Sequence, residues 1–175
     1  MTVTQERLRE LLSYNAETGV FTWLRRSENS RLDKIFNARF SGAKAGSPNS
    51  NGYLLIGIKG RLYPAHRLAW LWVHGTMPAD QIDHIDGNRA NNALANLREA
   101  TNSQNQRNRG STKRNTSGFK GVSWRKGEER WYAQIAASGR NIFLGYYDTP
   151  DAAAAAYAAA AAKYHGAFAN AGEAS

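Results

Sequence analysis

Hydrophobic and polar residues alternate along the chain with two periods, which predicts a mixture of helices and strands. The three leucines between positions 8 and 12 share one helical face, so their spacing predicts a helix over 4–13 with Thr4 as its cap. An apolar helix is predicted over 66–74 and is expected to end at Gly75. The polar segment 25–48 is predicted to be mostly loop. Alternation and the turn at Lys59-Gly60 predict strands over 19–24, 52–59 and 61–63.

The segment from Gln81 to Arg109 carries the most informative pattern. It predicts a short strand, a turn rich in Gly and Asn, a second strand opening with Asn96-Leu97-Arg98, and a polar helix. Thr101 and Gln104 match the S/T-x-x-E/Q capping box that marks a helix start. A strand-turn-strand-helix can gather a carboxylate, an imidazole and an amide from distant positions: Asp83, His84 and Asn105. These groups suit a hard divalent ion and proton transfer near neutral pH, as phosphodiester hydrolysis requires.

Beyond this segment the composition changes sharply. Residues 110–118 have the Gly, Ser, Thr and Lys content of a flexible basic linker, which predicts a domain boundary. Three strands are then predicted over 119–124, 130–136 and 141–147. An Ala-rich helix follows, capped by Thr149 and ended by Gly166. The expected fold class is therefore α+β.

Composition narrows the class of partner. The chain has 175 residues, a formal net charge of +9, five Trp and eight Tyr, which is typical of a folded basic protein. Such a balance favours nucleic acid, since no long apolar span suggests a membrane. The absence of cysteine excludes disulfides, a cysteine nucleophile and thiolate zinc sites. The first residues do not resemble a signal peptide, so a cytoplasmic protein is expected.

The residues around the Asp-His pair resemble the HNH homing endonucleases, in the phage and intron-associated branch where Asn replaces the last His. The resemblance rests on D-H-I-D-G-N from Asp83, N-L-R at Asn96, Asn105, and H-R-L-A-W from His66. It implies a ββα-metal nuclease core over 50–109, preceded by an N-terminal helix and strand extension over 1–49. It also implies cleavage of DNA strands, in a bacterial host cell or a phage-infected cell.

The same resemblance implies the role of each site residue. His84 is the expected general base and Asn96 ties the loop that positions it. Asp83 and Asn105 are the expected ligands of a divalent metal, with Mg²⁺ favoured and Mn²⁺ the alternative. Neighbours in a regular strand point to opposite faces, so a local irregularity is expected where Asp83 and His84 converge. Asp86 is the competing metal ligand, but the D-G-N sequence that it opens favours a turn residue whose side chain holds its own loop. Asn91 and Asn92 are interpreted as turn residues without chemistry.

The segment 117–169 resembles the AP2/ERF DNA-binding domain. F-K-G-V-S-W-R, R-W-Y-A-Q-I and I-F-L-G-Y-Y-D-T correspond to its three strands, and the Ala-rich stretch to its helix. The resemblance implies a three-stranded antiparallel sheet over 119–169 that lies in the major groove, where Arg125, Arg130 and Trp131 meet bases and phosphates. The family usually has Arg where this chain has Ser123, so its base preference is not carried over.

Together these patterns predict a two-module nuclease that acts on double-stranded DNA as a monomer and nicks one strand per site. The alternative is a non-catalytic DNA-binding or regulatory protein on the same scaffold, while RNA processing lacks a supporting signature. Phosphate and base contacts are expected from twelve positions: Arg67, Arg98, Arg107, Arg109, Lys113, Arg114, Lys120, Arg125, Lys126, Arg130, Trp131 and Arg140.

Overall fold

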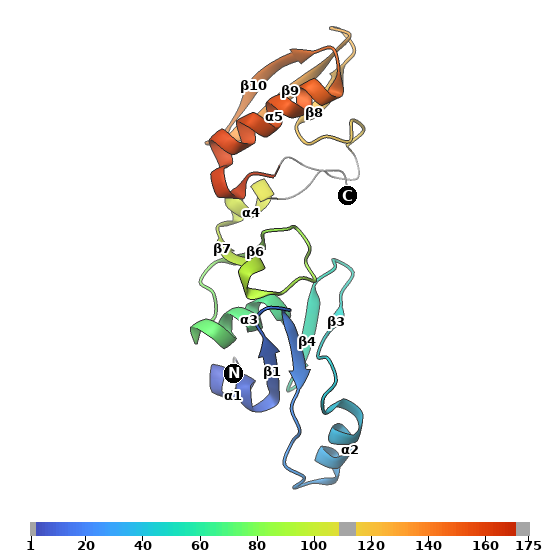
Figure 1. Cartoon of the computed structure of the whole chain (residues 1–175), viewed down its shortest axis with the longest axis vertical. Helices are drawn as coiled ribbons and strands as arrows, with labels where there is room; N and C mark the ends of the chain where they lie inside the picture. The colour runs from blue at the N-terminus through green and yellow to red at the C-terminus, as the bar shows by residue number, and fades with distance from the viewer. Residues whose placement is uncertain (1–2, 109–114, 171–175) are drawn as a thin grey trace. The chain divides into compact units, whose positions relative to one another are not determined.

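Two compact units make up the chain. The computed structural model describes residues 3–108 and 115–170, and its contacts separate Met1–Ala100 from Thr101–Ser175 (Figure 1). Arg109, Lys113, Arg114 and most of the predicted linker lie outside the described residues. The break between the units falls before the predicted nuclease helix, whereas the sequence predicted a boundary after it.

The described residues of the first unit form three small antiparallel sheets and three α-helices. The sheets pair β1 with β2, β3 with β4 and β5, and β6 with β7. The elements are α1 (Gln5–Leu11), β1 (Leu12–Asn15), β2 (Val20–Trp23), α2 (Arg31–Phe40), β3 (Ser47–Pro48), β4 (Leu54–Ile58), β5 (Arg61–Pro64), α3 (Ala65–His74), β6 (Gln81–His84), the 3₁₀ turn η1 (Leu94–Asn96) and β7 (Leu97–Ala100).

Local chemistry explains most of these elements. Thr4 caps α1 by accepting a hydrogen bond from the backbone of Arg7 at 3.2 Å. The β4–β5 hairpin turns at Lys59 and Gly60, whose φ angles of 48° and 76° are those of a primed turn. Gly75 ends α3 with a φ of 78°. The predicted helices at both places and the hairpin between them are confirmed.

One hydrophobic core serves the whole first unit. Leu8 and Leu12 from the N-terminal segment, Ile56 from β4, Leu68 from α3 and Leu97 from β7 are all buried in a single cluster. The segment 1–49 is therefore packed into the same body as β6 and β7. The N-terminal residues therefore pack against the two strands that carry the predicted active site.

Two features of the first unit differ from the sequence prediction. A helix, α2, lies inside the segment that was predicted to be loop. Ser30 caps it by accepting from the backbone of Asp33 at 3.1 Å, but Leu32 and Ile35 are 76% and 53% exposed, so the helix has no buried apolar stripe to detect. The predicted first helix also ends early, because Leu12 already pairs with Trp23 in the β1–β2 ladder.

The second unit begins with α4 (Asn102–Asn108) and continues as a three-stranded antiparallel sheet with one long helix. The strands β8 (Val122–Arg125), β9 (Arg130–Ala137) and β10 (Arg140–Tyr147) stand in the order β10-β9-β8. The helix α5 (Pro150–His165) crosses one face of this sheet and is followed by the 3₁₀ turn η2 (Gly166–Phe168) (Figure 1).

The predicted strands and helix of this unit are confirmed. Thr149 caps α5 by accepting from the backbone of Ala152 at 3.2 Å, and Pro150 opens its first turn. Small side chains let α5 approach the sheet closely, since Ala153 and Ala161 are buried beside Ile135 and Val122. Within the described ranges, no helix combines the length and apolar character needed to cross a membrane.

Candidate active site

The β6–β7 hairpin carries the Asp-His pair. Asp83 stands opposite Arg98 and His84 opposite Leu97, in a register without a bulge. Asp83 and His84 are 3% and 4% exposed, so both ionisable side chains are buried. The local irregularity expected in this strand does not occur in the described pairing. His84 is the last residue of β6, and the chain turns directly after it.

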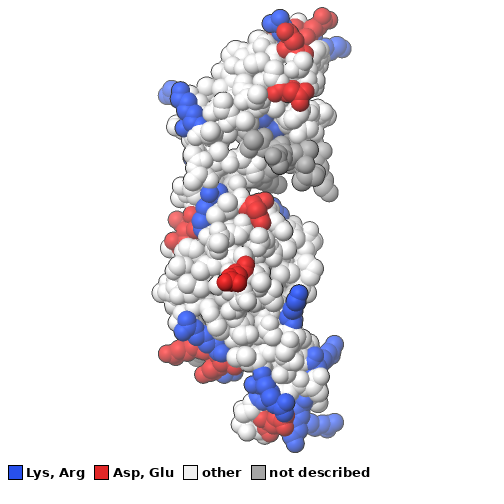
Figure 2. Space-filling view, in the orientation of Figure 1, with Lys and Arg blue, Asp and Glu red and all other residues white. Residues whose placement is uncertain are grey.

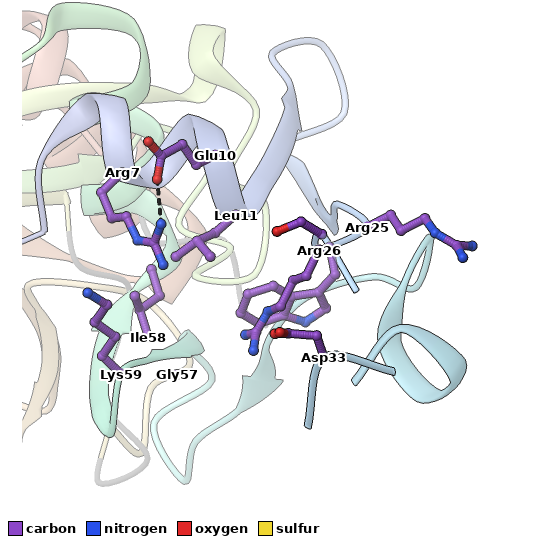
Figure 3. Close-up of a pocket in the computed structure, with 11 residues that line it drawn as sticks. Arg7, Glu10, Leu11, Arg25, Arg26, Asp33, Gly57, Ile58 and Lys59 are labelled. Carbon is purple, nitrogen blue, oxygen red and sulfur yellow. Dashed lines mark hydrogen bonds and ion pairs between the residues drawn. The ribbon is translucent and has the colours of Figure 1, made fainter. Parts of the chain in front are cut away.

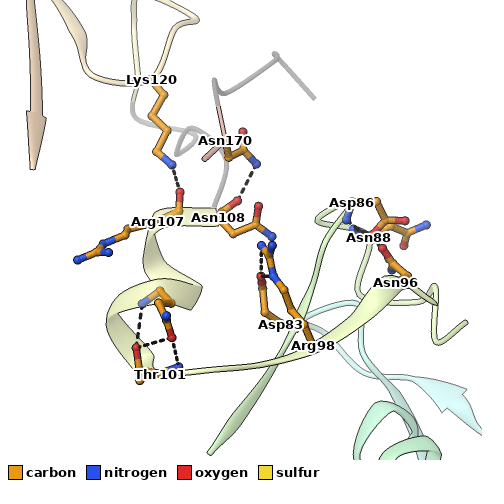
Figure 4. Close-up of polar contacts among 11 residues, drawn as sticks. Asp83, Asp86, Asn88, Asn96, Arg98, Thr101, Arg107, Asn108, Lys120 and Asn170 are labelled. Atoms are coloured by element: carbon orange, nitrogen blue, oxygen red, sulfur yellow. Dashed lines mark hydrogen bonds and ion pairs between the residues drawn. The ribbon is translucent and has the colours of Figure 1, made fainter. Parts of the chain in front are cut away.

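The carboxylate of Asp83 receives the guanidinium of Arg98. The Nε and Nη2 groups of Arg98 donate to the same oxygen, Oδ2, at 2.8 and 2.7 Å (Figure 4). The Arg98 side chain is only 18% exposed. A guanidinium that was predicted to contact DNA phosphate is thus turned inward, where it compensates the buried charge of Asp83.

The imidazole of His84 is enclosed by polar and aromatic neighbours. Its ring centroid lies 5.1 Å from that of His66 and 6.0 Å from that of Tyr53. Burial is the largest influence and lowers the pKa of His84 below its usual 6.5, although Asn92, Asp86 and Asp83 act in the opposite direction. The ring is therefore neutral at pH 7, which is the state that a general base requires.

The side chain of Asn92 faces the Nε2 nitrogen of His84. Asn92 Oδ1 lies 3.3 Å from His84 Nε2, and its Nδ2 donates to the carbonyl of Ala90 at 3.1 Å. Because the amide nitrogen is used by Ala90, the oxygen faces the imidazole and must accept from Nε2–H. The basic lone pair of His84 is consequently on Nδ1. Asn92 is 1% exposed, although the sequence suggested only a turn residue.

Asn96 closes the loop that follows His84. Its Oδ1 accepts from the backbone of Asp86 at 3.0 Å, and its Nδ2 donates to Asp86 Oδ1 and to the carbonyl of Asn91, both at 2.9 Å (Figure 4). Asp86 also accepts from the backbone of Asn88 at 2.8 Å. The carboxylate of Asp86 therefore holds its own loop.

Asn105 lies on α4, in the second unit. The capping box predicted for this helix is present: Thr101 Oγ1 accepts from the backbone of Gln104 at 3.3 Å, and Gln104 Oε1 accepts from the backbone of Thr101 at 2.8 Å. The backbone of Asn105 donates to the carbonyl of Thr101 at 3.0 Å. The convergence of Asn105 with Asp83 and His84 remains a prediction.

The donor atoms fit a hard cation better than zinc. Among the residues that the structure describes, no three His, Asp or Glu side chains gather as a metal site. The predicted ligands are instead one carboxylate and one amide oxygen, a set that suits Mg²⁺ completed by water and phosphate oxygens. The carboxylate of Asp83 fits this chemistry, and it already binds one cation, the guanidinium of Arg98.

Several predicted DNA contacts have partners inside their own unit. Arg67 donates to the carbonyls of Asp80 and Pro78, both at 3.0 Å, and so holds the segment before β6. Lys120 donates to the carbonyl of Arg107 at 2.5 Å, and burial lowers its pKa. Arg107 itself lies on α4, in the described part of the second unit. These bonds favour structural roles for Arg67 and Lys120.

The outward face of the second unit's sheet carries cations and aromatic rings. The Arg125 guanidinium lies over the Tyr132 ring at 4.5 Å, and Arg130 pairs with Asp148 at 3.2 Å. Phe143 and Tyr146 pack on Tyr132 but remain 53% and 40% exposed. Lys126 is also exposed, directly after β8. Arg140 is exposed too, but it pairs with the buried Ala137 and so lies on the other face of the sheet.

Trp131 belongs to the opposite face. It follows Arg130 in a regular strand, pairs with Trp124 at a ring distance of 5.3 Å and packs against the buried Val122 and Ala133. It was predicted to meet DNA together with Arg125 and Arg130. The alternation of the strand corrects this, since two adjacent residues cannot both face the same side.

Basic side chains also gather around α2. Arg31, Lys34 and Arg39 lie on this helix with a single acid, Asp33. Figure 2 shows Lys and Arg concentrated at the α2 end of the first unit. A pocket of about 530 Å³ lies beside it, lined by Arg7, Glu10, Leu11, Trp23, Arg25, Arg26, Ser27, Asp33, Gly57, Ile58 and Lys59. Figure 3 shows Arg25 pointing away from it. None of the predicted catalytic or metal-binding residues lines this pocket.

Known proteins share similarity with the segment that carries these residues. Residues 63–107 match the family profile described as HNH endonuclease. The chain is 45% identical to Protein 3.8 of Escherichia phage T7 over 76 residues, which cover 43% of this chain and 63% of that protein. It is 35% identical to an uncharacterized HNH endonuclease of Acanthamoeba polyphaga mimivirus over 106 residues, which cover 59% of this chain and 54% of the relative.

Both alignments thus span less than two thirds of the curated relatives. A structure of DNA binding and cleavage by the HNH homing endonuclease I-HmuI is 22% identical, with a TM-score of 0.40 over 83% of this chain and 76% of that chain. The matched segment 63–107 contains Asp83, His84, Asn92, Asn96 and Asn105. Residues 63–107 are therefore similar to the HNH endonuclease family.

Proposed function

We propose that this protein is a metal-dependent endonuclease that hydrolyses phosphodiester bonds of double-stranded DNA. The observation that carries the proposal is the buried imidazole of His84. Its Nε2 lies beside Asn92 Oδ1, burial lowers its pKa, and it stands next to the carboxylate of Asp83 in sequence. The match of residues 63–107 to the HNH endonuclease family supports the same chemistry.

His84 acts as the general base in this mechanism. Nδ1 takes a proton from the water that attacks phosphorus, while Nε2–H keeps its hydrogen bond to Asn92 Oδ1. That bond persists when the ring becomes positively charged and stabilises the imidazolium. General-base catalysis of this kind contributes about 10²- to 10⁴-fold to the rate.

Asp83 and Asn105 are the residues that would hold the metal. The chemistry that Mg²⁺ or Mn²⁺ would supply there is polarisation of a phosphoryl oxygen and stabilisation of the charge on the leaving 3′ oxygen. Before a metal binds, the guanidinium of Arg98 balances the negative charge of the Asp83 carboxylate. The guanidinium and the metal would thus share this carboxylate. One site of this kind hydrolyses one strand, so a monomer nicks duplex DNA.

The second unit supplies DNA recognition in this proposal. The resemblance of 117–169 to the AP2/ERF domain and the cations on the open sheet face support a major-groove reader. Arg125 and Arg130 are the side chains that would meet bases and phosphates. The aromatic side chains that share the face of Arg125 are Tyr132, Phe143 and Tyr146. In this proposal they make the aromatic contact with DNA that the sequence predicted for Trp131.

Nicking of a supercoiled plasmid tests the proposal. We expect the wild-type protein to convert supercoiled into open-circular DNA with Mg²⁺, and to stop in EDTA. His84→Ala should lower the rate at least a hundredfold. His74→Ala is the matched control, since His74 lies at the end of α3 against Trp70. Equal rates for His84→Ala and the wild type would refute the mechanism and favour a non-catalytic DNA-binding protein.

A further inference from the structure

The main chain of Asn92 is held by the β1–β2 hairpin at the other end of the first unit's sequence. Tyr14 Oη donates to the carbonyl of Asn92 at 2.8 Å. The backbone of Leu94 donates to the carbonyl of Ala16 at 2.8 Å. The main chain of Asn92 is thus bonded by Tyr14, 78 positions away, and the next residues are tied to the same hairpin through Leu94, while the side chain of Asn92 faces His84.

The tip of this hairpin lies directly on the peptide bond between Asn92 and Ala93. Gly19 has a φ of +72°, and a Cβ atom at this position would lie 2.2 Å from both Asn92 C and Ala93 N. Only glycine allows the two backbones to approach so closely. Any side chain at 19 must push the hairpin away from Asn92.

Tyr14 is fixed by the core on its other side. Its ring stacks on that of Phe21 with a centroid distance of 4.6 Å, and its centroid lies 6.3 Å from that of the Trp72 ring. Burial raises the pKa of Tyr14 to about 12, so the phenol stays protonated and can donate at any working pH. The hydroxyl therefore acts as a rigid support for the Asn92 carbonyl.

We propose that the β1–β2 hairpin is a positioning element of the nuclease site, in which Tyr14 and Gly19 hold Asn92 so that its side-chain oxygen orients His84. This inference rests on the proposed role of His84 as the base. Tyr14 and Gly19 touch neither substrate nor metal in this scheme and act only through Asn92. A small displacement of the base is enough to slow the reaction greatly.

The first test measures single-turnover nicking at saturating protein, together with plasmid affinity. Tyr14→Phe removes one hydrogen bond and should lower the rate roughly three- to tenfold without changing affinity. Gly19→Ala should lower it further. Gly42→Ala is the matched control, because Gly42 has a similar φ of +79° but no atom within 4 Å of the added Cβ. Thermal melting should show that each variant is folded at the assay temperature.

The second test reads the imidazole directly by ¹H–¹⁵N NMR of the ring of His84. The wild type should show the proton on Nε2, whereas Tyr14→Phe and Asn92→Leu should shift the ring signals toward a mixture of tautomers. A loss of stability that leaves the surroundings of His84 unchanged would not move these signals. If Gly19→Ala fails to fold, Tyr14→Phe decides the question alone.

The outcomes distinguish the positioning role of the hairpin from the proposed nuclease function. Rates for Tyr14→Phe within twofold of Gly42→Ala, with unchanged ring signals, overturn the positioning role. A slower reaction without a tautomer change also overturns it, because the effect then bypasses Asn92. If the wild type does not nick DNA at all, the proposed function fails, and the ring signals still decide whether the hairpin orients His84.

Discussion

Arg98 donates two hydrogen bonds to a single carboxylate oxygen of Asp83, from the directly opposite position of the neighbouring strand. The Asp83 side chain is 4% exposed, so its negative charge would be costly without the guanidinium. This pairing joins a predicted metal ligand to a residue that was predicted to bind DNA. It gives the site a cation of its own before any metal binds.

Replacing Arg98 by Met should therefore destabilise the first unit. Removing one partner leaves a buried carboxylate uncompensated, and the free energy of unfolding should fall by about 3 kcal/mol. Urea denaturation measures this change. Added Mg²⁺ should restore part of the loss if Asp83 is a metal ligand. Arg7→Met removes an exposed pair with Glu10 and serves as the control with little expected change. Equal effects of the two variants would contradict this account.

His66 should make the protein less stable as the pH falls. Burial lowers its pKa to about 3 in the folded state, from an ordinary value of 6.5. Between these values the unfolded chain binds the extra proton, so stability is full above pH 6.5 and is lost on acidification, by about 1.4 kcal/mol per pH unit. Melting curves from pH 7 to pH 5 should show a smaller loss for His66→Phe. Parallel losses in both proteins would exclude His66 as the cause.

Arg125 should contribute to DNA binding through the open sheet face. Its guanidinium lies over Tyr132 and is exposed. We expect Arg125→Met to weaken duplex binding about tenfold, and a phosphate contact would reduce the salt slope by about 0.9. Fluorescence anisotropy at several salt concentrations measures both. Lys163→Met is the matched control, because Lys163 is also a cation that lies over a tyrosine ring, but on α5. If the two variants bind equally well, the face of Arg125 is not the reader.

Gly121 should be essential for the second unit, whereas its neighbour Gly118 should tolerate alanine. Both have positive φ angles, of +71° and +77°. A Cβ at Gly121 would lie 2.3 Å from the Tyr157 ring and 2.5 Å from the Gln134 carbonyl oxygen, but nothing lies within 4 Å at Gly118. Gly121→Ala should cost about 1–3 kcal/mol more than Gly118→Ala. Thermal melting of the two variants tests this, and similar melting temperatures would count against the packing of α5 described above.

Much of the fold follows from interactions within a few residues. The capping box of Thr101 and Gln104, the Thr149 cap and the Lys59-Gly60 turn are all local, and each appears in the structure as expected. The helix α2 escaped prediction for the opposite reason. Asn37 anchors it through two hydrogen bonds with the main chain of Arg26, each 2.8 Å long, and that contact leaves no periodic pattern.

The sequence by itself determined the residue types of the site, because the Asp-His pair, Asn96 and Asn105 occur in a recognisable order. Only the tertiary structure decided what surrounds them. Asn92 looks like one more turn residue, yet its neighbours His84 and Tyr14 lie 8 and 78 positions away. Hydrogen bonds between distant segments form only once a shared core brings those segments together, so their partners cannot be read from local pattern.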